Sequence, residues 1–199
     1  MHRAKQLKYC LSIILPLVVV LTFNIAEAET ANWTHWDKAM ESIKQKDYNN
    51  AFTELNYYFL HPDMHRDFWG VAYFGRALVF EAQERYKEAL EEYKKSIEND
   101  YFSVSITEKA LLNMASLYFK MKNYDDAVNA YKKLIDVNTK SGLGYYYLGM
   151  SYYEKKEYDL AWKNARIAQQ LGIPFTALID KLKKVTKEPP EAVRDQGGS

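Results

Sequence analysis

The sequence has little cysteine, glycine and proline. Its 199 residues include one Cys, eight Gly and five Pro. The cysteine, Cys10, lies in a leader segment that we expect to be removed, so the mature chain has no internal disulfide and needs no oxidative folding. Glycine and proline are scarce inside the periodic segments, and no stretch alternates steadily between apolar and polar residues, which argues against a sheet. Stability must therefore come from the packing of helices, which a chain of this length can supply in one domain.

Motifs that would indicate catalysis are also missing. The mature chain has no cysteine nucleophile, no glycine-rich phosphate loop, no His-Glu-x-x-His helix and no Gly-x-Ser-x-Gly elbow. His61 and His65 stand four residues apart beside Pro62, but no third ligand follows at a recognisable spacing, and we interpret them as part of a solvated loop. We predict that the protein is not an enzyme and has no cofactor and no metal site.

The N-terminus has the three parts of a secretory signal peptide. Three basic residues begin it: Arg3, Lys5 and Lys8. An apolar run from Cys10 to Phe23 follows, and Ala28 with Ala26 supplies the small residues of a cleavage site. The run is short of the roughly 20 residues that cross a bilayer, and Pro16 interrupts it. We predict a signal peptide over residues 1–28, cleavage after Ala28 and a periplasmic or secreted protein; the alternative is an uncleaved anchor in the inner membrane.

The charge of the mature chain is nearly balanced. Removing residues 1–28 takes three of the 27 basic residues and one of the 26 acidic ones, which leaves 24 and 25. Nucleic-acid binding needs a clustered basic excess, so we expect no nucleic acid as partner. A membrane would be contacted only through an uncleaved signal.

The chain repeats itself at intervals of 38, 38 and 34 residues. Four tyrosines each precede an alanine by three positions: Tyr48 and Ala51, Tyr86 and Ala89, Tyr124 and Ala127, Tyr158 and Ala161. Around each pair, a stretch with apolar residues three and four apart runs into a short polar turn and a second such stretch. This pattern predicts a series of paired amphipathic helices.

The last of these units resembles the tetratricopeptide repeat family most closely. The matching positions are Tyr145, Leu148, Gly149, Tyr152, Tyr158, Ala161, Ala165 and Ala168. The second and third units match well, while the first keeps only Ala39, Tyr48, Ala51 and Leu55. The resemblance implies an all-α fold, a right-handed α-solenoid of about four helix hairpins over residues 29–187. The repeats are expected at about 32–65, 70–103, 108–141 and 142–174.

The residue types of the repeats are those that the close packing of helices requires. Helices that cross closely need small side chains, and we expect Ala77, Ala115 and Gly149 to face the periodic alanines. We also expect Tyr86, Tyr124 and Tyr158 to be core residues with their hydroxyls reaching water or a carbonyl. Residues 105–108, Ser-Ile-Thr-Glu, resemble a capping box that opens the third hairpin.

After Gly172 the repeat pattern ends, and a single helix and a tail are predicted. Residues 175–187 place Phe175, Leu178, Ile179, Leu182 and Val185 on one face, which predicts the capping helix that a helical array needs at its exposed end. Residues 188–199 include Pro189 and Pro190, which end the helix, and have no apolar periodicity; we predict a disordered tail.

The resemblance also implies where a partner would bind. In this family the first helices of successive repeats line a concave groove. The groove residues predicted from that register are Trp33, Trp36, Met40, Phe74, Leu78, Leu112, Phe119, Tyr146, Met150 and Tyr153. Family members that clamp a C-terminal carboxylate use basic residues and asparagines at the fifth and ninth positions, and here those positions are mostly apolar or aromatic.

An apolar groove indicates a protein or peptide partner, because a large exposed apolar patch is otherwise an aggregation liability. Two alternatives stay open: the chain fills its own groove, or copies of the chain self-associate through it. We therefore predict an exported interaction scaffold that binds an apolar peptide or helix. The alternatives are a membrane-tethered envelope assembly factor and a homo-oligomeric structural protein.

Overall fold

The computed structural model describes residues 33–61, 68–100, 104–173 and 176–189, and these ranges contain helices and turns without a strand. The helices are one over residues 33–44, then α2 (Tyr48–Leu60), α4 (Trp69–Ala82), α5 (Tyr86–Glu98), α6 (Val104–Lys120), α7 (Tyr124–Val137), α8 (Gly142–Glu154), α9 (Tyr158–Gln170) and α10 (Thr176–Val185). The predicted signal peptide, His65 and residues 190–199 lie outside the described residues.

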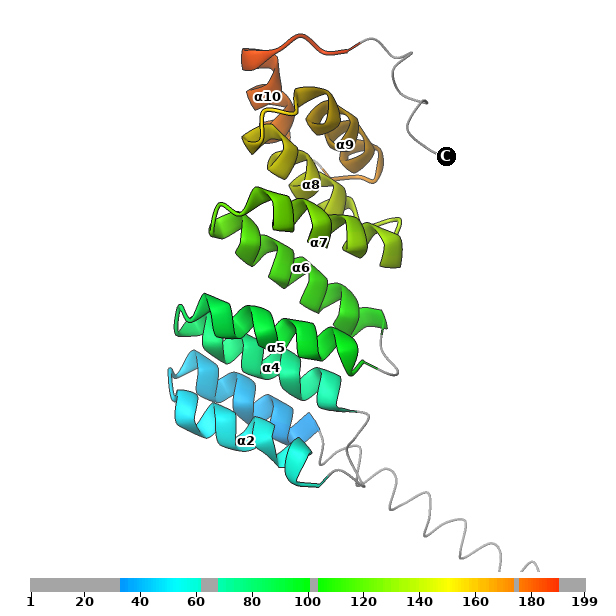
Figure 1. Cartoon of the computed structure of the whole chain (residues 1–199). Coiled ribbons are helices and arrows are strands. Elements are labelled where there is room, and N and C mark those ends of the chain that lie inside the picture. Colours follow the sequence, from blue (N-terminus) through cyan, green and yellow to red (C-terminus); the bar gives the residue numbers. More distant parts are fainter. Residues whose placement is uncertain (1–32, 62–67, 101–103, 174–175, 190–199) are drawn as a thin grey trace, which may run out of the picture.

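The helices pair into hairpins that stack in chain order (Figure 1). The helix over 33–44 pairs with α2, α4 with α5, α6 with α7 and α8 with α9, while α10 packs on the last hairpin. The predicted all-helical solenoid of four hairpins with a C-terminal helix is confirmed.

Small residues allow the helices of each hairpin to cross closely. Ala77, Ala89, Ala115 and Ala127 are fully buried, as predicted. A Cβ atom added to Gly149 would lie 2.8 Å from Cδ2 of Leu178 and 3.3 Å from the carbonyl oxygen of Ala161. A side chain at this position of the fourth hairpin, where the second and third carry alanine, would therefore require Leu178 of α10 to move.

The tyrosines of the core are not those that the repeat spacing singled out. Tyr86, Tyr124 and Tyr158, predicted as core residues, are only half-buried. The fully buried tyrosines are Tyr58, Tyr93 and Tyr131. The periodic tyrosines begin the second helices, beside the turns, so their rings cover the core from its edge. Tyr93 and Tyr131 sit two helical turns further along, where the next hairpin covers them.

Every hairpin turns through a non-glycine residue in the left-handed conformation. Lys46, Glu84, Lys122 and Lys156 have φ angles between 60° and 64°. In each turn the following N–H donates to a carbonyl five residues back, as from Asn123 to Tyr118 at 2.9 Å. This bond satisfies a carbonyl at the end of the first helix, and it closes the same compact turn four times.

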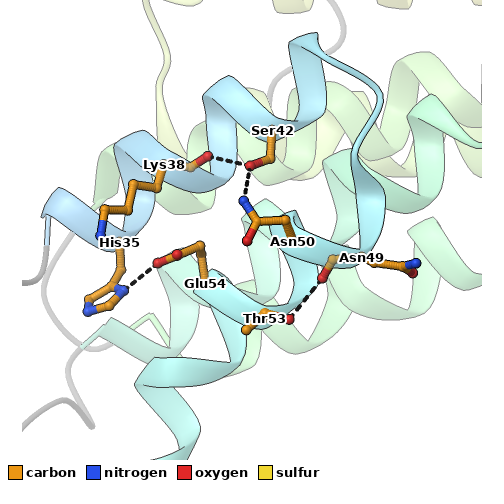
Figure 2. Close-up of polar contacts among 7 residues, drawn as sticks. All are labelled: His35, Lys38, Ser42, Asn49, Asn50, Thr53 and Glu54. Carbon is orange, nitrogen blue, oxygen red and sulfur yellow. Dashed lines mark hydrogen bonds and ion pairs between the residues drawn. The ribbon is translucent and has the colours of Figure 1, made fainter.

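Polar contacts hold the first hairpin, whose sequence matches the repeat pattern least (Figure 2). Nδ1 of His35 lies 2.6 Å from Oε2 of Glu54 on α2. Further along, the Asn50 amide donates to Oγ of Ser42 at 2.7 Å. These contacts between the two helices supplement the buried pair Ala39 and Ala51.

A partly buried ion pair joins the two helices of the second hairpin. Nε of Arg76 on α4 lies 3.0 Å from a carboxylate oxygen of Glu92 on α5, whose side chain is 5% exposed. Nη1 of Arg76 also donates to the side-chain oxygen of Asn56 on α2. The carboxylate is further paired with Lys95, so its burial is compensated by two cations.

Asp100 caps α6 in place of the expected capping box. Its carboxylate accepts from the backbone N–H of Thr107 at 2.9 Å and from its hydroxyl at 2.7 Å. Helix α6 already begins at Val104, and Glu108 accepts from Asn138. The box prediction was wrong because Ser105 already lies inside α6, and a residue of the preceding connection accepts from the Thr107 N–H instead.

The last helix is a cap, as predicted. Leu178 and Leu182 of α10 are fully buried, and Val185 is exposed. The predicted tail, however, was expected to begin at residue 188. Arg166 of α9 instead donates to the Glu188 carboxylate at 2.8 Å and to the Pro189 carbonyl at 2.7 Å. These two residues therefore belong to the folded part of the chain.

Replacing Ala127 by leucine should overpack the crossing of α6 and α7, where no space is left beside a fully buried alanine. We expect a loss of about 1 to 3 kcal/mol in the free energy of unfolding, measured by urea denaturation. Asn129→Leu, on the exposed side of α7, is the matched control and should change stability by less than about 0.5 kcal/mol. Equal effects of the two substitutions would contradict the proposed crossing.

Replacing Lys122 by glycine should stabilise the protein. Lys122 has a φ angle of 61°, which costs an L-residue about 1 to 2 kcal/mol, whereas glycine adopts it freely. Glycine also raises the conformational entropy of the unfolded chain, which offsets part of this effect. We therefore expect the free energy of unfolding, measured by thermal or urea denaturation, to rise by about 0.5 to 1 kcal/mol. Lys122→Val, at the same site, should be destabilising. A destabilising glycine would show that the turn depends on the lysine side chain.

Candidate functional site

An open cleft of about 660 Å³ runs across the first helices of three successive repeats. It lies between the helix over 33–44, α4 and α6, which is the concave side that the repeat register predicted. Its walls differ in chemistry, and each is formed by residues that recur on one face of a helix.

The apolar wall comes from the first two repeats. Met40 and Ile43 are contributed by the helix over 33–44, and Leu78 and Ala82 by α4. Met40, Ile43 and Leu78 are half-buried, so each presents part of its side chain to the cleft and packs the rest on the core. Burying such a side chain fully under a partner contributes up to about 1.5 to 3 kcal/mol.

The opposite wall is polar and belongs to α6. Asn113, Ser116 and Lys120 are spaced by three and four residues, so they share one face of this helix. They present an amide, a hydroxyl and an ammonium group in a row. Lys44 and Glu81 add charges at the same end of the cleft.

Two buried tyrosines form hydrogen bonds with side chains of this polar wall. The Tyr93 hydroxyl donates to Glu81 at 2.7 Å and accepts from the Asn113 amide at 3.2 Å. Burial, followed by the Glu81 carboxylate, raises the pKa of Tyr93 far above its usual range, so the hydroxyl stays a donor. The Tyr131 hydroxyl lies 3.1 Å from Oγ of Ser116, and burial raises the pKa of Tyr131 to about 12. The Asn113 and Ser116 side chains are therefore held in orientation.

The predicted groove residues of the first two repeats divide into two groups. Met40 and Leu78 line the cleft. Trp36 and Phe74 stack on each other with ring centroids 6.2 Å apart, and Phe74 is only 6% exposed. Phe74 is thus enclosed by the array and offers almost no surface to a partner. Trp33 remains 48% exposed, with its ring edge-on to Phe68.

The predicted residues of the last two repeats lie outside this cleft. Leu112, Phe119, Tyr146 and Met150 are half-buried against the core. Tyr153 is half-buried as well, and the Lys181 ammonium of α10 lies 5.5 Å from its ring centroid. The capping helix therefore approaches the end of the concave surface.

Asn113, Lys120 and Lys44 line the cleft and were not among the predicted residues. The register used for the prediction takes the second, fifth, ninth and twelfth positions of each repeat. These three residues occupy the sixth and thirteenth positions. The spacing of Asn113 and Lys120 on α6 can be seen in the sequence. The sequence of one helix does not show, however, how that helix is rotated against its neighbours.

Other kinds of site are not evident in the part of the chain that the structure describes. Across residues 33–61, 68–100, 104–173 and 176–189, no cluster of three or more His, Cys, Asp or Glu side chains could hold a metal ion. Over the same residues, no helix combines the length and the apolar character that crossing a membrane requires.

Comparisons with known proteins agree with this architecture. Tetratricopeptide repeat models match residues 71–101, which fall in the second hairpin, and residues 112–170, which span the third and fourth. A TPR repeat-containing protein of Methanocaldococcus jannaschii is 29% identical over 123 residues, or 62% of this chain. The chain spans about a fifth of that relative's length, 20%.

Solved structures show the same fold at low sequence identity. The crystal structure of the MamA protein has a TM-score of 0.62 at 17% identity, covering 83% of this chain and 85% of that one. A tetratricopeptide repeat protein from Parabacteroides merdae has a TM-score of 0.58 at 18% identity, covering 78% and 61%. The hairpins, the small residues at their crossings and the family models lead to one conclusion: residues 71–101 and 112–170 of this chain are tetratricopeptide repeats.

Proposed function

We propose that this protein is an exported interaction scaffold that holds a short apolar segment of a partner protein in its concave cleft. The observation that carries the proposal is the apolar wall of the cleft, where Met40, Ile43 and Leu78 stay partly open to solvent beside an ordered polar wall. The fold itself supports a role in binding other proteins, since such arrays present extended concave surfaces.

The chemistry of the two walls suits a peptide better than a small metabolite. Met40 is an adaptable apolar contact, and Leu78 beside it can receive a partner's side chain. The Asn113 amide uses one N–H for Tyr93, which leaves a donor and an acceptor to meet a peptide bond of the partner. A segment lying along the cleft can therefore bury side chains on one wall while its backbone stays hydrogen-bonded on the other.

The export part of the proposal rests on residues 1–28 and their signal-peptide pattern. Cleavage after Ala28 would release the repeats into the periplasm or the medium. The array needs no disulfide there, because its stability comes from helix packing.

The binding proposal is tested by photo-crosslinking in cells from Met40 and Ser116, which lie on opposite walls of the cleft. Lys94, exposed on α5, is the control position. We expect both cleft positions to capture one protein that Lys94 does not. Capture of this chain alone, or equal capture from all three positions, would contradict the proposal.

Leu78→Asp should weaken binding of the captured partner by about tenfold or more. The substitution places a charge on the apolar wall, which the partner would have to desolvate. The affinity of purified protein for the captured segment, measured by fluorescence anisotropy, checks this. Val137→Asp, at an exposed apolar site of α7, should leave the affinity unchanged. Circular dichroism of both variants separates lost binding from lost folding.

The export proposal makes a separate prediction for the mass of the protein isolated from its own cells. Intact-mass spectrometry should give a chain that begins at Glu29. A chain that keeps residues 1–28 and fractionates with membranes would instead indicate the membrane-tethered assembly factor. That result would not bear on the proposal that the cleft binds a partner.

A further inference from the structure

A second cleft, of about 450 Å³, lies on α7, α8 and α9, away from the concave site. Ile135, Leu160 and Ile167 are among its apolar lining residues. Leu160 is 40% exposed, so much of its side chain is open to solvent at the cleft. The cleft thus presents apolar surface on helices that take no part in the proposed partner site.

Three charged residues line the same cleft: Lys132, Asp136 and Lys163. The Lys132 ammonium lies 5.9 Å from the ring centroid of Tyr152. Within the described part of the chain, none of the three charges forms an ion pair. An apolar cleft bordered by two positive charges and one negative charge can select a segment with the opposite pattern.

The residues that follow α10 are held against α9, one of the three helices that line the cleft. Arg166 of α9 holds the Glu188 carboxylate and the Pro189 carbonyl, so the residues after α10 are fixed on α9. At 100° per residue, Lys163 lies between Arg166 and Leu160 around the axis of α9. A chain that starts at Arg166 can thus reach the cleft by crossing the side of α9 that carries Lys163.

The next residues have the composition that the cleft requires. Residues 190–195 read Pro-Glu-Ala-Val-Arg-Asp, with two acids, one base and a central apolar pair. Their charges are opposite in sign to the two lysines and one aspartate of the cleft. Six extended residues span about 20 Å, twice the roughly 10 Å diameter of a helix, which is enough to cross α9.

We propose that residues 191–195 fold back over α9 and occupy this outer cleft. Val193 lies on Leu160 and Ile167, the two acids face Lys163 and Lys132, and Arg194 faces Asp136. The segment shields the outer cleft within the same molecule, so a partner with a similar acidic and apolar segment has to displace it. This inference is independent of the concave site.

Disulfide trapping in the full chain tests the proposal. Cys10 is replaced by serine, and Val193→Cys is combined either with Leu160→Cys in the cleft or with Gln170→Cys. Gln170 is exposed and one helical turn from Arg166, so it is nearer to the anchor than Leu160 is. A tail that samples space freely would therefore react with position 170 at least as fast as with position 160.

We expect the 193–160 disulfide to form about tenfold faster than the 193–170 disulfide, because docking raises the effective concentration at the cleft. Lys163→Glu should slow the 193–160 reaction by about two- to fivefold, and adding Glu191→Lys should restore the rate. Equal or faster reaction at position 170, a disulfide between two chains, or no rescue by the reversed charge pair would overturn the proposal.

Discussion

The close crossing of the two helices in each hairpin is the constraint on which the rest of the structure depends. Ala77, Ala115 and Gly149 occupy equivalent places in the first helices of three repeats. Both alanines are fully buried, and a Cβ atom on Gly149 would lie 3.3 Å from the Ala161 carbonyl oxygen of the second helix. Larger residues there would separate the helices and tilt the next hairpin. Because the crossing repeats almost unchanged, the hairpins stack in one direction, and their first helices come together on one concave side.

The same stacking explains why the concave surface is ordered. Tyr93 belongs to a second helix, yet its hydroxyl reaches Glu81 on the helix before it and Asn113 on the helix after it. One hairpin further along, the Tyr131 hydroxyl likewise reaches Ser116 on the helix before it. Buried phenols thus connect the packing core to the polar wall of the cleft. The proposed partner site therefore has rigid support, which would reduce the entropy lost on binding.

The fold was largely predictable from the sequence, whereas the site was only partly so. The spacing of Tyr48, Tyr86, Tyr124 and Tyr158 fixes the hairpins, because each tyrosine starts a helix directly after a turn. The register on one helix also indicates which side faces the groove, and it places Met40 and Leu78 in the cleft. It cannot show that Phe74 is enclosed through its stack with Trp36, or that Asn113 reaches the cleft, since both depend on the rotation of neighbouring helices. The contact of Asp100 with Thr107 of α6 was not predictable for a similar reason, because it depends on how the residue before the helix is placed in space.

The central claim is the proposal that the concave cleft receives the scaffold's partner. Methyl NMR of methionine-labelled protein measures this directly, because Met40 lines the cleft, Met114 is buried in the core and Met121 is exposed at a turn. On addition of the captured partner segment, the account predicts a large shift of the Met40 signal, with Met114 and Met121 little changed. A shift of Met121 without one of Met40 would contradict it and would place the partner on another face of the array.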